Sequence, residues 1–332
     1  MLNFHIKSAE LNGYRNIRNT KTEFCEGLNI IIGPNGCGKS NFLWFLVNIH
    51  TNDFDFEYSA DFEFYLPQYG NIKYKYKKTF IEGKKFGGNI ELDNEALRQI
   101  STSYLLLNYN IPSVIPCFSA PDDITILNFV QSRRFILNTQ STILPNIFKN
   151  EFNFDFINFD TITRKQIAIH TPIKDIQVKN RILGSRNNEQ EIKMNSLLYE
   201  FQTEDGEWYT WNELSDGTRR IVWIVLNILT TDKKVVFIEE PEIGIHPPQL
   251  QKLMEFVKEQ SQEKQIIITT HSPEVLNHCI TSEDLDRIII AKMTNEGTKM
   301  HHLDEKQQKK ILKYLKNELS IADYWLHSDL EK

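Results

Sequence analysis

The chain has 332 residues, of which 40% are hydrophobic and 25% are charged, and its formal net charge at pH 7 is -6. This length can bury a full core, and the negative balance argues against a protein that coats nucleic acid through bulk charge, though not against a local basic groove. Four scattered cysteines without a CxxC pair exclude a disulfide framework and a cysteine zinc site, and no apolar run is long enough to span a membrane. We therefore expect a cytoplasmic protein without membrane contact.

The first 32 residues predict two or three short strands separated by polar turns, the last at residues 28–32. The stretch "GPNGCGKSN" follows this strand and precedes a helix-like run, and it matches the phosphate-binding pattern GxxxxGK[ST]. In such a loop, backbone N–H groups surround phosphate oxygens, the lysine reaches the terminal phosphates and the serine ligates magnesium. A glycine-rich turn can also serve packing alone, but the flanking strand and helix favour phosphate binding. The predicted nucleotide-binding residues here are Asn35, Gly36, Cys37, Gly38, Lys39, Ser40 and Asn41.

Further along, "ADFEFYLPQYGNIKYKYKKTF" alternates on both sides of a turn-like "PQYG", which predicts an antiparallel hairpin. With the turn centred on Tyr69, Phe62 faces Tyr76 and Asp61 faces Lys77. One face is then aromatic and the other carries pairs of opposite charge. The basic "KYKYKK" run alone is typical of a nucleic-acid site, but its pairing with acids favours an antiparallel lobe.

The segment "WNELSDGTRR" opens an apolar, helix-capable run, with Ser215 in the N-cap position and Gly217 in the first turn. A helix start presents free N–H donors and a hydroxyl to an anion.

The stretch "VVFIEEPEIGIHPPQL" is a buried-type strand that ends in two adjacent carboxylates, Glu239 and Glu240. Like charges at this spacing repel and are costly to bury, so a cation is expected beside them. In P-loop enzymes one such acid holds magnesium and a neighbouring carboxylate positions the attacking water. We assign Glu239 to the metal and Glu240 to the water; the alternative is a strand end whose carboxylates point into solvent.

A further buried-type strand, "QIIITT", ends at His271, about 30 residues after the carboxylate pair and in the place of a γ-phosphate sensor. A purely structural histidine is the alternative. Later, "EKQQKKILKYLKNEL" places lysines opposite an apolar helical stripe. We favour a solvated helix face there, and DNA contact is the alternative.

Five ordered segments together resemble the ABC-type ATPases of the SMC, RecF and OLD group, especially the compact bacterial "AAA family ATPase" members: "NGYRNI", "GPNGCGKSN", "LSDGTRR", "FIEEPEIGIHP" and "TTHSPEVL". By this resemblance Lys39 and Ser40 bind the triphosphate and magnesium, and Glu239 is the second metal residue. Glu240 is then the catalytic carboxylate and His271 the switch histidine.

The same resemblance gives roles to residues outside these strand ends. It implies that Ser215 and Gly217 contact the γ-phosphate bound to a second subunit. Arg15 matches the arginine of the family's N-terminal N-F-R stretch, and Gln131 is the candidate for its glutamine loop, with Gln68 a poorer one. Glutamate at 239 in place of aspartate, and "SDGT" in place of glycine-glycine-glutamine, point to the OLD-like branch.

The expected fold is α/β: a P-loop NTPase of the ABC type with a mainly parallel core sheet, an antiparallel β lobe and a helical or irregular insertion. The core strands are predicted at residues 28–32, 235–239, 265–269 and 287–291. We expect one domain over residues 1–332, comprising a P-loop half at 1–134 with its lobe at about 52–80, an insertion at about 135–205, and a C-terminal half at 206–332. About 60 residues follow His271, which is too few for the nuclease domain of OLD proteins.

These features predict an ATPase that uses ATP and Mg²⁺ and forms nucleotide-sandwiched homodimers or higher homo-oligomers. We expect it to regulate a separately encoded effector, a nuclease or toxin, in anti-phage defence. The alternative is a RecF-like ATPase that binds DNA in repair or recombination. A transporter ATPase is disfavoured by the "SDGT" sequence.

Overall fold

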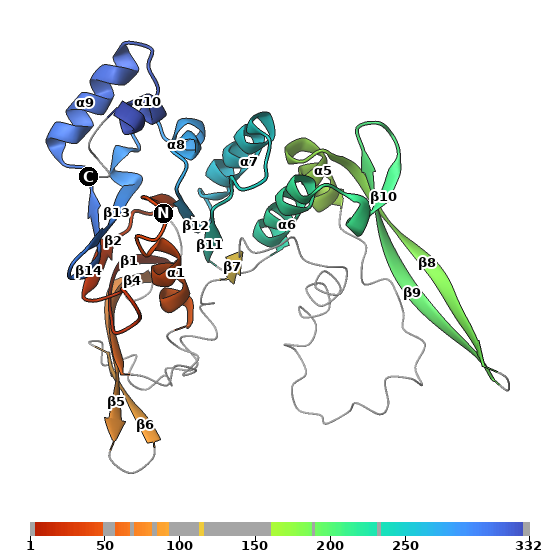
Figure 1. Ribbon diagram of the computed structural model, residues 1–332, viewed down its shortest axis with the longest axis horizontal. Coiled ribbons are helices and arrows are strands. Elements are labelled where there is room, and N and C mark those ends of the chain that lie inside the picture. Colours follow the sequence, from red (N-terminus) through yellow and green to blue (C-terminus); the bar gives the residue numbers. More distant parts are fainter. Residues whose placement is uncertain are drawn as a thin grey trace. The chain divides into compact units, whose positions relative to one another are not determined.

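The computed structural model describes residues 4–48, 57–66, 70–81, 85–92, 113–115, 161–187, 190–230 and 234–327 (Figure 1). The chain divides into two compact units. The first comprises Met1–Cys117, Thr230–Ile243 and Leu250–Lys332, and the second comprises Phe118–Leu229 and Gly244–Gln249.

A six-stranded sheet forms the centre of the first unit, in the order β14-β13-β3-β12-β11-β7. Its strands are β3 (Leu28–Ile32), β7 (Ser113–Ile115), β11 (Val235–Glu239), β12 (Gln265–Thr270), β13 (Ile288–Thr294) and β14 (Gly297–His302). Neighbours are parallel except β14, which runs antiparallel to β13. All residues of β3, β11 and β12 are buried, as expected for apolar runs in a parallel sheet covered on both faces. The predicted parallel core is therefore confirmed.

A second, antiparallel sheet in this unit has the order β2-β1-β4-β5-β6. Its strands are β1 (His5–Asn12), β2 (Thr20–Glu23), β4 (Tyr58–Leu66), β5 (Gly70–Ile81) and β6 (Lys85–Leu92). Helix α1 (Lys39–Asn48) contributes Phe42, Leu43 and Phe45 to one hydrophobic core with side chains of β1, β4 and the parallel sheet. The helix that follows the glycine-rich loop is thereby fixed by apolar packing against both sheets.

The predicted hairpin of β4 and β5 is confirmed, but its predicted register is wrong by two residues. Leu66 pairs with Gly70, so Asp61 lies opposite Lys75 rather than Lys77 and forms an ion pair of 3.5 Å with it. The strand pairing is centred one residue earlier in the sequence than predicted. A shift of two residues leaves each side chain on its predicted face, because strand side chains alternate with a period of two.

The second unit contains a three-stranded antiparallel sheet in the order β10-β9-β8. Its elements are α5 (Thr161–His170), β8 (Ile173–Asn187), β9 (Gln190–Thr203), β10 (Trp208–Thr210), a short 3₁₀ helix (Trp211–Glu213) and α6 (Asp216–Thr230). The buried Trp211 packs on Phe201, with ring centroids 5.4 Å apart. The helical or irregular insertion predicted at 135–205 needs correction, since 173–203 is mostly a long hairpin. Polar residues interrupt the apolar alternation in that stretch, which obscured the strand pattern.

The remaining helices are α7 (Pro247–Gln260), α8 (Glu274–Cys279), α9 (Glu305–Lys316) and α10 (Ile321–His327). The predicted helices after the glycine-rich loop, after "LSDG" and at 248–260 are thus all present. Helix α10 lies beside both α8 and α9 (Figure 1). The Ala322 amide donates to Asn277 of α8, and the Tyr324 ring packs against Tyr314 of α9. Among the described helices, none is long and apolar enough to cross a membrane.

Candidate functional site

Three predicted motifs begin at one edge of the parallel sheet. Glu239 at the end of β11 pairs in register with Thr269 of β12, and Thr269 pairs with Ile31 near the end of β3. With neighbouring strands about 4.8 Å apart, these rows place the acidic pair about 10 Å from the β3 row. The glycine-rich loop, Glu240 and His271 therefore all start from the same carboxyl edge.

The glycine-rich loop is packed tightly against its neighbours at Gly38. This residue has φ +103°, and a Cβ atom on it would collide with the side chains of Thr298 and Asn16. Thr298, buried on β14, also donates a 2.8 Å hydrogen bond from its hydroxyl to the Cys37 carbonyl. Glycine is therefore required at this position both by the backbone conformation and by space.

Lys39 carries the charge of the loop. Its side chain is 4% exposed, and Nζ donates to the carbonyl oxygens of Gly33 at 2.6 Å and Pro34 at 3.0 Å. No carboxylate among the described residues forms an ion pair with it. A buried ammonium held only by neutral groups is stabilised further by an anion, and the adjoining start of α1 offers free backbone N–H groups. The loop therefore fits a phosphate group.

The predicted residue Arg15 lies beside this loop. Its backbone is left-handed at φ +51°, and Nη1 donates to Oδ1 of Asn41 at 2.9 Å. The Asn41 amide in turn donates to Oδ1 of Asn16 at 2.7 Å, and the Tyr14 ring lies 5.1 Å below the guanidinium. The structure thus brings Arg15 into contact with Asn41, which lies in the first turn of α1.

At the acidic pair, Glu239 is 3% exposed, and Glu240 leaves the strand with φ +42° immediately before Pro241. A non-glycine residue in this conformation costs about 1–3 kcal/mol, and such strain is found preferentially at functional sites. The Glu240 amide nevertheless donates to the Thr269 carbonyl at 2.7 Å. Glu240 Oε1 lies 3.3 Å from Nδ1 of His271, so the predicted water-positioning acid and the predicted phosphate sensor are in contact.

One acid that contacts His271 was not predicted. Glu242 Oε1 accepts hydrogen bonds from the Thr270 hydroxyl at 2.5 Å and from the His271 amide at 3.2 Å, and it lies 3.4 Å from His271 Nδ1. The sequence signal was its place two residues after Glu240, beyond a proline that turns the chain back.

The predicted metal residues Ser40 and Glu239 belong to the first turn of α1 and the end of β11. Within the described ranges, no group of three or more histidine, cysteine or acidic side chains is arranged to hold a metal by itself. Magnesium bound with a nucleotide keeps waters and phosphate oxygens among its ligands and needs only one or two protein groups.

The segment with Ser215 belongs to the second unit. The Ser215 hydroxyl accepts the Thr218 amide at 3.2 Å, which confirms the predicted N-cap of α6. Gly217 packs against Gly244, where a Cβ atom would collide with the Gly244 carbonyl. Ser215 is exposed, so the start of α6 offers donors to solvent. Gln131 and Gln68 lie outside the described residues.

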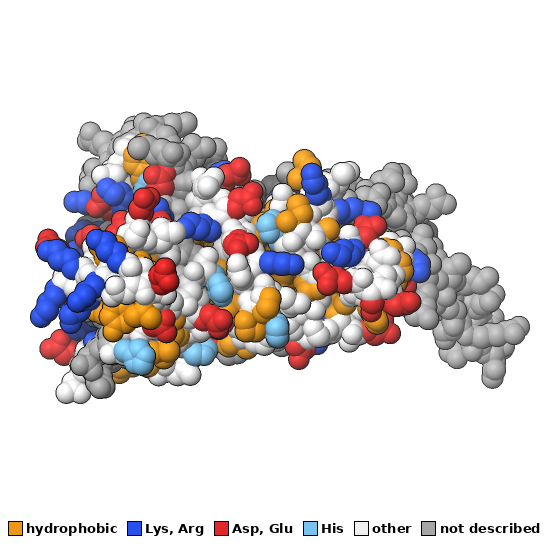
Figure 2. Space-filling model, turned by 90° about the horizontal axis from the view of Figure 1, so that it is seen from above, with side chains coloured by type: hydrophobic (Ala, Val, Ile, Leu, Met, Phe, Trp, Pro, Cys, Tyr) orange, Lys and Arg blue, Asp and Glu red, His pale blue; other side chains and the backbone are white. Residues whose placement is uncertain are grey.

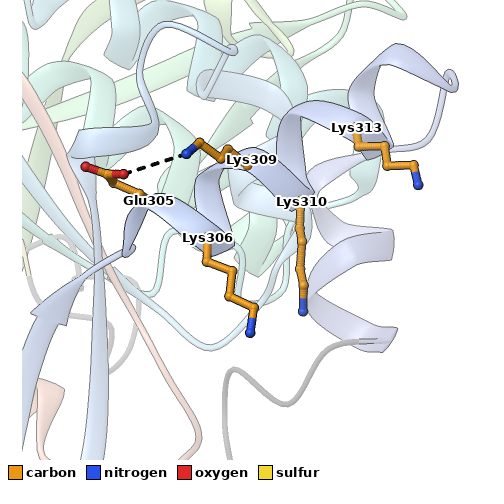
Figure 3. A pocket seen from close by; sticks show the side chains of 5 residues that line it. All are labelled: Glu305, Lys306, Lys309, Lys310 and Lys313. Carbon is orange, nitrogen blue, oxygen red and sulfur yellow. Dashed lines mark ion pairs between the residues drawn. The ribbon is translucent and has the colours of Figure 1, made fainter.

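A row of lysines covers α9. The blue side chains at the left end of the face in Figure 2 mark this part of the first unit. A surface hollow there is lined by Glu305 and by four lysines, Lys306, Lys309, Lys310 and Lys313. We call these four lysines the α9 lysine row. Lys306 and Lys310 extend side by side, whereas Lys309 turns towards Glu305 at 3.7 Å (Figure 3).

The sequence is similar to several known proteins. Residues 133–277 match the family described as "AAA domain, putative AbiEii toxin, Type IV TA system". The chain is 22% identical to Septu protein PtuA of Bacillus thuringiensis over 84% of this chain and 74% of that protein. It is 23% identical to an ATP/GTP phosphatase of Helicobacter pylori over 91% and 93% of the two chains. It is also 26% identical to the DNA replication and repair protein RecF of Caldanaerobacter subterraneus, over 58% and 57%.

Solved structures resemble the fold of the chain. The Smc head domain of Pyrococcus furiosus, solved with an extended coiled coil and bound to the C-terminal domain of ScpA, matches 94% of this chain and all of that chain, with a TM-score of 0.57 and 14% identity. The SMC head domain of Thermotoga maritima matches 90% of this chain with a TM-score of 0.55 and 13% identity. The chain is therefore similar in sequence to ATPases that include RecF, and it has the fold of the SMC head domain.

Proposed function

We propose that this chain binds ATP with magnesium at the glycine-rich loop, hydrolyses it, and closes as a dimer around the nucleotide. The observation that carries this proposal is the buried Lys39, bound only by neutral groups, on the same sheet edge as the contacting pair Glu240 and His271. The likeness to an ATP/GTP phosphatase over most of both chains supports hydrolysis.

In this proposal Lys39 and the backbone amides of Asn35, Gly36, Cys37 and Gly38 contact the phosphates, with Arg15 and Asn41 beside them. Ser40 and Glu239 would hold magnesium, which supplies positive charge against the phosphate oxygens. Glu240 accepts a proton from water as that water attacks the terminal phosphorus, and ADP leaves. His271 senses the terminal phosphate, and Gln131 remains a proposed contact.

The second half of the site comes from another copy of the chain. Ser215 and Gly217 stand at the start of α6, where free amides and the helix dipole attract an anion. When these donors meet the γ-phosphate held by a partner, its charge is stabilised from both copies, so ATP binding favours association.

Phosphate release from ATP by the purified chain tests this function. We expect turnover that stops when EDTA removes magnesium and falls to background in Lys39→Ala. Lys252→Ala, which replaces an exposed lysine of α7, serves as the matched control and keeps full turnover. Equal turnover in Lys39→Ala and the control contradicts the proposal.

We further propose that this ATPase regulates a separately encoded effector, a nuclease or toxin, in anti-phage defence. The likeness to Septu protein PtuA and to a family described by a putative toxin supports this role. Plating phage on cells that carry the native locus tests it, since Glu240→Gln should remove protection without lowering the protein level. Protection equal to wild type speaks against this role.

The α9 lysine row supports a second candidate, a RecF-like ATPase that contacts DNA. Binding of duplex DNA should then weaken with salt, and replacing Lys306 and Lys310 by glutamate should reduce the slope of log K against log salt by about 2. A slope unchanged by both substitutions removes the lysine row from DNA contact.

A further inference from the structure

Glu242 lies in the turn after β11 and is nearly enclosed. Its side chain is 9% exposed, yet its two oxygens have different surroundings. Oε1 accepts from the Thr270 hydroxyl and the His271 amide, whereas Oε2 is buried without a hydrogen-bond partner. A buried oxygen without a partner costs about 1–3 kcal/mol, so a carboxylate kept in this state is explained better by function than by stability.

The Thr270 hydroxyl orients this carboxylate. Its Oγ1 donates to Glu242 and accepts a hydrogen bond from the Ser272 amide at 2.9 Å. This one hydroxyl therefore connects Thr270 and Ser272, the residues on either side of His271, to the Glu242 carboxylate. The chain that leaves β12 is therefore held by Glu242 at consecutive residues. This arrangement limits the positions available to the imidazole.

The ring nitrogen Nδ1 of His271 meets two carboxylates. Glu240 Oε1 lies at 3.3 Å and Glu242 Oε1 at 3.4 Å. Ionised carboxylates only accept hydrogen bonds, so a nitrogen that faces two of them must carry a proton. In the neutral ring this leaves Nε2 as the acceptor, and in the charged ring both nitrogens donate.

We propose that Glu242 is a positioning residue that keeps the proton on Nδ1 of His271 and thereby makes Nε2 the nitrogen presented to the nucleotide. The catalytic consequence rests on the proposed ATPase function, but the proton position does not. Glu242 acts through His271 and Thr270, and it is distinct from Glu240, which we assign to the attacking water.

Glu242→Gln separates this role from simple support of the strand end. The glutamine carbonyl can still accept from Thr270 and from the His271 amide, but it removes the negative charge from Nδ1. Support of the strand end alone therefore predicts wild-type behaviour. Positioning predicts a turnover about 10-fold lower at an ATP KM within about 3-fold of wild type.

The direct readout is the ring nitrogen spectrum of protein labelled with ¹⁵N-histidine, in which His271→Gln assigns the signals of His271. At high pH we expect protonated Nδ1 in the wild type and a weaker preference for that form in Glu242→Gln, where Glu240 is the one remaining carboxylate beside Nδ1. Glu274→Gln is the matched control, because Glu274 faces His278 at 3.8 Å on α8 and should leave the His271 spectrum unchanged.

Thr270→Val offers a second route if Glu242→Gln unfolds, since it removes the orienting hydroxyl and keeps both carboxylates. It should also weaken the preference for protonated Nδ1. An Nδ1 preference equal to wild type in the folded variants overturns the inference. An inactive wild type with the expected ring spectrum instead overturns the ATPase function and leaves the proton position standing.

Discussion

The glycine-rich edge of the first unit and the start of α6 in the second unit differ in how far their polar side chains are buried. Lys39 and Glu239 are almost fully buried, whereas Ser215 and Asp216 are exposed at a helix start. The buried ammonium of Lys39 is bound only by neutral groups, so a small anionic ligand would stabilise it. Exposed donors at a helix start form hydrogen bonds with water, and they remain accessible to a partner molecule.

This difference separates nucleotide binding from closure, and the two steps should be separable by mutation. Substitutions at the buried edge should abolish ATP binding itself. Substitutions at the start of α6 should leave ATP binding intact and abolish closure of the dimer, and with it ATP turnover.

The largest expected effect is on Lys39→Ala. Its ammonium is the charge of the loop, and charge-assisted hydrogen bonds to phosphate are each worth about 1.5–3 kcal/mol, so ATP affinity should fall about 100-fold or more. Titration with a fluorescent ATP analogue measures this loss. Affinity within a few-fold of wild type would place the nucleotide elsewhere.

Ser215→Arg should have the opposite profile. A long charged side chain at the N-cap blocks the helix start, so turnover should fall about 100-fold, as for loss of one preorganised donor group. ATP affinity of the single chain should stay within about 3-fold of wild type, since Ser215 belongs to the other unit. The same titration and a phosphate assay separate the two values, and a parallel loss of both contradicts the division.

Gln265→Leu tests the packing beneath the site. The Gln265 amide accepts from the Ile6 amide and donates to the Ile6 carbonyl, both at 2.8 Å, and it also reaches the Cys25 carbonyl at 3.0 Å. Leucine leaves these backbone groups without side-chain partners, so the free energy of unfolding should fall by about 2 kcal/mol. Urea denaturation measures this loss, and an unchanged midpoint would show that Gln265 does not join the two sheets energetically.

The smallest expected effect concerns Cys25. Burial, with the nearby Asp286 carboxylate, raises the pKa of its thiol to about 11. The folded state therefore favours the neutral thiol, and alkylation of Cys25 at pH 8.5 should be about 10-fold slower than in urea. Mass spectrometry of the Cys25 peptide follows the reaction, and equal rates would contradict the raised pKa of this half-buried thiol.

The sequence predicted the strands and motifs that lie on buried apolar runs. Apolar runs rich in isoleucine and valine within 28–32, 235–239 and 265–270 predict a parallel sheet on their own, and the end of each run located the site. Ser215 was likewise predicted as an N-cap, because the capping residue stands directly before its helix.

Features that depend on distant contacts were not predictable. Thr298 supports the glycine-rich loop from β14, 261 residues beyond Cys37, and no local pattern marks it. Glu242 reaches Thr270 and His271 only because β11 and β12 pair side by side, which the local sequence does not show. The hairpin at 173–203 was missed because polar residues interrupt its apolar alternation, and the pairing of its two long strands is not visible in the local sequence.

The most direct test of a site completed by two copies is the mass in solution of Glu240→Gln with magnesium and ATP. Without hydrolysis the closed state should accumulate, so sedimentation should give twice the mass seen without nucleotide. Adding Ser215→Arg to the same chain should return the mass to that of one copy although ATP stays bound. A Glu240→Gln chain that binds ATP and keeps the mass of a single copy contradicts the account.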